Sequence, residues 1–218
     1  MSPQRLVRWS GAALASGGLS FVLFLLLHPY NELAGAHASH MATWVPAHSF
    51  HFLGALLTLF GLVGLYIRQL RESGWLGLAG FVVSFCGMTM FAGTGLITAY
   101  IWPVIAKADP SFVEPDGPMF KDPLAIGVID STYAVMVVGF LLFGVAIYRA
   151  RIFPRGGAIL TMLGVILFSA PVEPVGPAPW IVRIAGACVF GAGLIWLGLA
   201  LWLNTAVVAE EREPVPLG

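Results

Sequence analysis

Four of the chain's five histidines lie within fifteen residues, in the stretch HASHMATWVPAHSFH from 37 to 51. His37 and His40 are three residues apart, and so are His48 and His51, which places both rings of a pair on one face of a helix. Four imidazoles can fill the coordination shell of zinc or suit copper(II). The pattern therefore predicts a transition-metal site. Because HxxH is short, histidines that only hydrogen-bond to loop carbonyls remain an alternative.

The remaining histidine allows a different cofactor. His28 ends the first apolar segment, at the same membrane level as His48 and His51. A b-type haem takes two axial imidazoles, and His28 with either of these two would supply them. No CxxCH motif for covalent haem attachment is present. Haem b, with His28 as a cofactor-binding residue, is thus the alternative to zinc or copper.

Two ionisable residues fall inside apolar segments, Asp130 and Arg183. A charge within the bilayer costs about 2.5–3.5 kcal/mol or more and usually has a partner. One interpretation is a structural ion pair between the two. The other is functional, with Asp130 as a catalytic general base, a metal ligand or an anchor for a histidine N–H. Six polar residues are expected to line an outer vestibule together with Asp130 and the histidines: Glu32, Thr94, Thr98, Tyr133, Glu173 and Arg183.

The composition says which elements must position these residues. Hydrophobic residues make up 58% of the 218 and charged residues 10%, against about 25% charged in soluble domains. This is the composition of a membrane protein, and the expected partner of its apolar surface is the lipid bilayer. The formal net charge is zero, so no basic field attracts nucleic acid.

A bilayer crossing needs about 20 mostly apolar residues, and long apolar runs without alternation must be helices rather than barrel strands. Six segments qualify: Trp9 to His28, Pro46 to Arg68, Trp75 to Trp102, Leu124 to Tyr148, Gly156 to Ala170, and Trp180 to Leu203. The sequence predicts an all-α polytopic bundle of six membrane-spanning helices over residues 1–205, followed by a short cytoplasmic tail, 206–218.

Orientation follows from the arginines, which concentrate on the cytoplasmic side of membrane proteins. Seven of them precede the first segment, end the second, or follow the second and fourth: Arg5, Arg8, Arg68, Arg71, Arg149, Arg151 and Arg155. Both termini are therefore expected in the cytoplasm and all five histidines on the outer side of a bacterial inner membrane. The alternative is that the first segment is a secretory signal cleaved after Ala36, although its apolar run exceeds the usual 7 to 15 residues or so.

Two further segments leave alternatives open. The fifth apolar segment is short, which indicates either a sunken outer vestibule beside it or a tilted helix that starts at Ile152. The loop from Pro103 to Pro123 is either a lid over the vestibule or a solvated connector. Cys86 and Cys188 lie mid-segment, where cysteine is expected to be a buried apolar filler.

These patterns predict a metal-binding membrane protein, a redox enzyme or hydrolase acting on a lipid-soluble or periplasmic substrate. The alternative is a non-catalytic accessory or scaffold subunit, working in a membrane complex or as a homo-oligomer, in which histidines serve loop hydrogen bonds or respond to pH. Transport is disfavoured because the cytoplasmic half offers few polar side chains, namely Ser16, Thr58, Ser84 and Thr161.

Overall fold

The computed structural model describes residues 3–29, 36–114, 116–170 and 178–210, and these contain helices and no strand. The predicted all-α fold is thereby confirmed. The long helices are α1 (Pro3–Leu27), α3 (Trp44–Leu96), α6 (Pro123–Ala150), α7 (Arg155–Phe168) and α8 (Ala178–Glu210). The short elements are α2 (Ala36–Ser39), the π-helix η1 (Ile97–Ile101), α4 (Trp102–Ala108), the 3₁₀ helix η2 (Pro110–Val113) and α5 (Pro118–Lys121).

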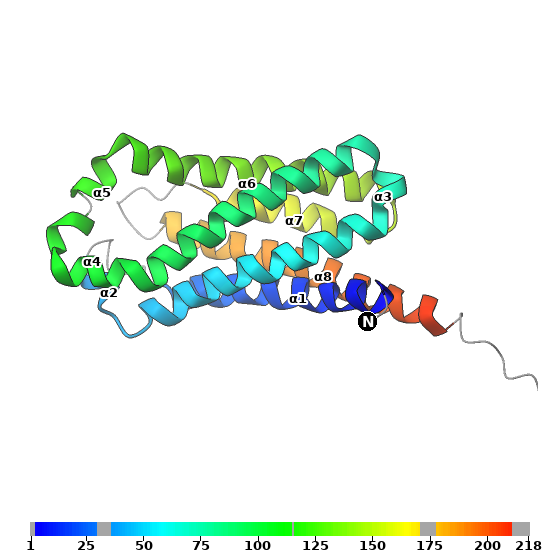
Figure 1. The fold of residues 1–218 in the computed structure, drawn as a ribbon, viewed down its shortest axis with the longest axis horizontal. Coiled ribbons are helices and arrows are strands. Elements are labelled where there is room, and N and C mark those ends of the chain that lie inside the picture. The colour runs from blue at the N-terminus through cyan, green and yellow to red at the C-terminus, as the bar shows by residue number, and fades with distance from the viewer. Residues whose placement is uncertain (1–2, 30–35, 115, 171–177, 211–218) are drawn as a thin grey trace, which may run out of the picture.

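Helix α3 folds back on itself at Gly74. This residue has φ 55° and ψ −153°, a conformation that only glycine adopts without steric cost. The arm before it, 44–73, and the arm after it, from 75 through η1, then run antiparallel (Figure 1). The rings of Tyr66 and Phe81 stack across them with centroids 4.6 Å apart, and the indole of Trp44 donates to the carbonyl of Thr98 at 2.8 Å.

Four helices in the described part of the chain are long and apolar enough to cross a membrane: Gln4–Leu27, Trp44–Ala108, Pro123–Ala150 and Trp180–Leu203. The second has 65 residues. Drawn out straight it would measure about 98 Å, three times the hydrocarbon core of about 30 Å, and the fold at Gly74 divides it. Large apolar side chains cover the outside of the bundle, among them Trp75, which is 85% exposed. The molecule is a helical membrane protein.

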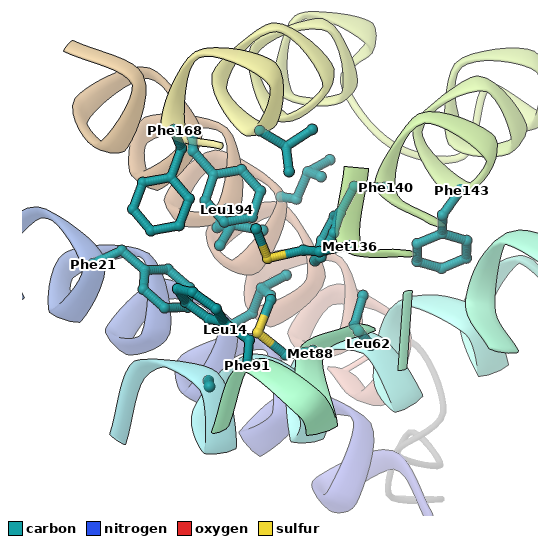
Figure 2. Packing of buried hydrophobic residues seen from close by; sticks show 14 of the residues in the cluster. Leu14, Phe21, Leu62, Met88, Phe91, Met136, Phe140, Phe143, Phe168 and Leu194 are labelled. Carbon is teal, nitrogen blue, oxygen red and sulfur yellow. The ribbon is translucent and has the colours of Figure 1, made fainter. Parts of the chain in front are cut away.

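The long helices form a closed ring in chain order. Helix α1 packs on the first arm of α3, the second arm on α6, α6 on α7, α7 on α8, and α8 on α1. Aromatic rings from opposite sides meet in the centre. Phe21 lies 5.9 Å from Phe91 and 5.7 Å from both Phe168 and Phe190, measured between ring centroids. Figure 2 shows Phe21, Phe91 and Phe168 pointing into this shared core.

One end of the bundle carries a helical cap, which we define as α2, α4, η2 and α5 (Figure 1). It has an apolar cluster of its own, formed by Ala36, Ala38, Trp44, Trp102, Ala106 and Val113. A carboxylate oxygen of Glu114, the residue after η2, accepts a hydrogen bond from the backbone N–H of Ala36 in α2 at 3.3 Å. This bond connects α2 to the rest of the cap. The interpretation of the loop from Pro103 as a solvated connector is therefore wrong, because Ala106 and Val113 are fully buried.

Three expectations about the helices need correction. Helix α7 begins at Arg155, directly after Pro154, so the tilted helix starting at Ile152 is wrong. Cys86 and Cys188 are exposed on the outer apolar surface rather than buried. The end opposite the cap, here the Gly74 end, also holds more buried polar groups than expected. Ser10, Gln69 and Ser73 are buried there, and neither amide atom of Gln69 has a partner among the described residues.

Candidate functional site: a cavity beneath the cap

A cavity of about 250 Å³ lies at the cap end, between the ends of the long helices and the cap. Its aromatic wall is formed by Phe24, Trp44, Trp102, Phe120, Tyr133 and Trp180. Its polar side chains are His28, His48, His51, Thr94, Thr98 and Arg183. Residues from α1, both arms of α3, α6, α8 and the cap thus meet around one space, which no single segment of the chain could form.

Helical spacing explains how each helix presents its residues. Trp44, His48 and His51 stand at i, i+4 and i+7 on the first arm, and so share a face. On the second arm, Thr98 lies within the π-helix η1 and Thr94 lies one turn before it. At the end of η1 the backbone N–H of Trp102 donates to the carbonyl of Ile97. Such π-helical turns insert an extra residue into a helix and are frequent at functional sites.

His51 is the most unusual side chain of the site. It is 4% exposed, and neither of its ring nitrogens has a hydrogen-bond partner among the described residues. Phe24 stacks on it at 4.7 Å and Phe91 lies at 3.9 Å, both measured between ring centroids. Burying a polar group without a well-formed hydrogen bond costs free energy, which makes His51 a candidate functional residue.

The other two imidazoles are neighbours of His51. His48 donates from Nδ1 to the carbonyl of Trp44 at 3.0 Å, which fixes the orientation of its ring. Its ring centroid is 6.4 Å from that of His51 and 5.0 Å from that of His28. His28 stacks on Trp180 at 4.8 Å, and its Nδ1 is buried without a hydrogen-bond partner among the described residues.

Arg183 closes the polar side of the cavity. Its Nε donates to the carbonyl of Phe168, the last residue of α7, at 3.0 Å, and its Nη2 donates to the hydroxyl of Tyr133 at 2.8 Å. One guanidinium therefore joins α8 to α7 and α6, and it satisfies a carbonyl that the end of α7 would otherwise leave open.

The structure contradicts the expected ion pair of Asp130 with Arg183. Asp130 is exposed on the outside of α6, and no salt bridge joins the two in the described part of the chain. Ile129 and Tyr133, four residues apart, are the α6 residues that line the cavity. Asp130 follows Ile129 by one residue, which turns it about 100° away around the helix. The proposed general base thus lies outside the cavity.

The four histidines of the motif do not come together. His37 and His40 lie at the cap helix α2, both exposed, and neither lines the cavity. His40 instead bonds through Nδ1 to the carbonyl of Ala36 at 2.5 Å. Glu32 and Glu173, the two acids expected in the vestibule, lie outside the described residues.

The cavity fits a metal or haem only in part. Over the described ranges, no group of three or more His, Cys, Asp or Glu side chains is placed to hold a metal ion. With centroids 5.0 Å apart, the rings of His28 and His48 leave no room for a porphyrin between them. The pairing of His28 with His51 around haem stays a prediction.

Sequence reasoning missed the aromatic wall. Trp44 stands four residues before His48, and Trp102 four residues after Thr98, so helical spacing from the polar residues would have identified both. The indole Nε1 of Trp102 is buried and has no hydrogen-bond partner among the described residues. Trp102, His28 and His51, which all line the cavity, thus each carry a hydrogen-bonding group without a partner among the described residues.

Known proteins offer no guide to this site: the chain matches no protein-family model, and no curated protein or solved structure is significantly similar to it.

Proposed function

We propose that this is a six-span bacterial inner-membrane protein whose cavity, on the outer side, binds a small organic molecule from the periplasm or the outer leaflet. Counting the two arms of α3 and the short α7 separately gives the six spans. The orientation rests on the seven arginines named above, which the helix order places at the Gly74 end. This puts both termini in the cytoplasm and the cap outside.

The observation that carries the proposal is the burial of His51 beside the cavity with both ring nitrogens unsatisfied. A ligand that accepts from one nitrogen, or donates to the other, would recover free energy that the ligand-free protein lacks. Small-molecule sites have this make-up: apolar and aromatic walls with a few convergent polar groups. A volume of about 250 Å³ suits a molecule of about one ring.

The described lining contains no carboxylate, so it offers no acidic general base for a hydrolase. The lining therefore supports binding of a small molecule, rather than a redox or hydrolytic reaction, as the function of the cavity. Asp130 on the outside of α6 is more readily explained by a contact with a second copy or an accessory subunit of a complex, since a buried or lipid-facing acid needs a partner.

The location and the binding are tested together by thiol labelling. In a background of Cys86→Ala and Cys188→Ala, Thr98→Cys places a thiol in the cavity wall. We expect a membrane-impermeant maleimide to label it in sealed right-side-out vesicles. Excess benzamide, a neutral compound of one ring, should slow this labelling severalfold because it occupies the same space.

The matched control is Arg149→Cys in the same background, at an exposed position of the Gly74 end. It should be labelled only after the vesicles are opened, and benzamide should not change its rate. Labelling of Arg149→Cys in sealed vesicles would reverse the proposed orientation. Labelling of Thr98→Cys at one rate with and without benzamide would argue against a binding cavity.

Zinc or copper binding is the second candidate. It is favoured by the proximity of His28, His48 and His51 and by the unpartnered ring nitrogens of His28 and His51. The guanidinium of Arg183 in the same cavity opposes it, because it repels a metal cation. His37 and His40 could contribute only as ligands on the route of entry.

The metal candidate predicts one zinc or copper ion per chain in the purified protein, lost when His48→Ala and His51→Ala are combined. Metal analysis by mass spectrometry measures this directly. The matched control is His37→Ala with His40→Ala, which should keep the metal because both rings lie outside the cavity. A wild-type protein without metal, after purification free of chelators, would remove this candidate.

A further inference from the structure

Two of the polar side chains around the cavity, those of Trp102 and Arg183, are hydrogen-bond donors only, and this limits which ligands can bind. A tryptophan indole can only donate a hydrogen bond, and an arginine guanidinium has five N–H donors and no acceptor. Trp102 Nε1 is buried without a partner among the described residues. Arg183 has three N–H groups beyond the two bonded to Phe168 and Tyr133. The donors thus call for a ligand rich in acceptors.

The charge in the cavity points the same way. The guanidinium of Arg183 is a cation, and the described lining residues include no aspartate or glutamate. In surroundings of low dielectric, a cation that has no acidic partner among the described lining residues attracts an anion strongly. Carboxylate groups match the planar guanidinium with two parallel hydrogen bonds.

The rest of the wall sets the body of the ligand. Aromatic rings from Trp44, Trp102 and Trp180 face the space, together with Phe24 and Phe120. Such surfaces favour apolar or planar groups and disfavour a hydrophilic body. A sugar or a free phosphate would leave hydroxyl groups or charges facing rings that cannot pair with them.

On the basis of the proposed function, we infer that the cavity binds a small organic carboxylate with an apolar body. Its carboxylate meets the guanidinium of Arg183, and its body lies among the aromatic rings. The buried N–H groups of His51 and Trp102 are further donors to the ligand. Two sources share this chemistry, a soluble aromatic acid from the periplasm and a short fatty acid from the membrane. Benzoate and octanoate represent the two.

The test is calorimetric titration of the detergent-purified full chain at neutral pH with benzoate and with benzamide, which differ in charge but hardly in shape. A charge-assisted hydrogen bond stabilises by about 1.5–3 kcal/mol, so benzoate should bind at least about tenfold more tightly. Arg183→Gln should remove this preference and keep benzamide binding, which also shows that the variant is folded. Arg149→Gln, with an equal charge change at the opposite end, should leave both affinities unchanged.

A second variant avoids any loss of helix contacts. Trp102→Phe keeps an aromatic ring and deletes the buried N–H, and should weaken benzoate severalfold. Trp75→Phe on the exposed surface is its control. Tighter binding of octanoate or of benzoate assigns the source, and either result supports the inference. Equal affinities of the wild type for benzoate and benzamide would overturn the inferred preference for a carboxylate but not the proposed binding cavity. If none of the three compounds binds, the proposed function is overturned as well.

Discussion

Gly139→Ala is expected to destabilise the bundle by about 3 kcal/mol, at the upper end of the usual cost of overpacking. A Cβ built on Gly139 lies 2.3 Å from the backbone nitrogen of Ser84 and 2.6 Å from its Cα. Backbone atoms cannot swing aside as the end of a side chain can, so α6 and the second arm of α3 must move apart. Close approach of this kind is what small residues provide between helices in a membrane.

The control lies in the same helix. A Cβ on Gly127 meets nothing within 4 Å. Gly127→Ala should therefore cost nothing and gain up to about 1 kcal/mol from helix propensity. Reversible unfolding in mixed micelles measures both variants. Gly87 and Gly93 repeat the contrast in α3, since only a Cβ on Gly87 meets backbone, that of Met136 at 2.6 Å. Equal stabilities of Gly139→Ala and Gly127→Ala would contradict the packing described for α6.

His51→Phe is expected to stabilise the ligand-free protein by about 1–3 kcal/mol, the cost of leaving a buried polar group unsatisfied. The substitution keeps a ring between Phe24 and Phe91, and its additional volume can enter the adjoining cavity. The same variant should bind benzamide and benzoate less well. Higher stability with weaker binding is what a residue retained for function should show.

His48→Phe is the matched control one turn away. Its Nδ1 donates to the carbonyl of Trp44, so the substitution removes a hydrogen bond that is made. We expect a loss of about 0.5–1.5 kcal/mol rather than a gain. Thermal unfolding of both variants in one detergent compares them. A loss of stability in His51→Phe equal to that of His48→Phe would mean that the nitrogens of His51 are satisfied in the protein.

Much of the fold could be predicted because it depends on local properties of the chain. The apolar segments, the positions of arginine and the spacing of polar residues along each helix are written in the sequence. His48 with His51 and Thr94 with Thr98 share faces because of helical geometry alone. These pairs, with His28 and Arg183, were predicted at one level of the bundle and all line one cavity.

What the sequence could not decide was the rotation of each helix against its neighbours. Asp130 and Tyr133 were both expected at the vestibule, yet only Tyr133 lines the cavity and Asp130 is exposed. The reason is that packing against α3 and α7 turns Ile129 and Tyr133 inward. Likewise Arg183 could have paired with several groups near its membrane level. It donates to the carbonyl of Phe168 because the end of α7 lies beside it in the tertiary structure.

The sequence by itself determined that the chain is a helical membrane protein, with seven of its arginines toward one end and its histidines toward the other. The tertiary structure alone decided that three histidines share a cavity with one arginine, while His37 and His40 remain on the cap. Periodicity is a property of ten or twenty neighbouring residues. A cavity bounded by five long helical segments and a cap depends on contacts between residues far apart in the chain, such as those of Phe24, Trp102 and Trp180.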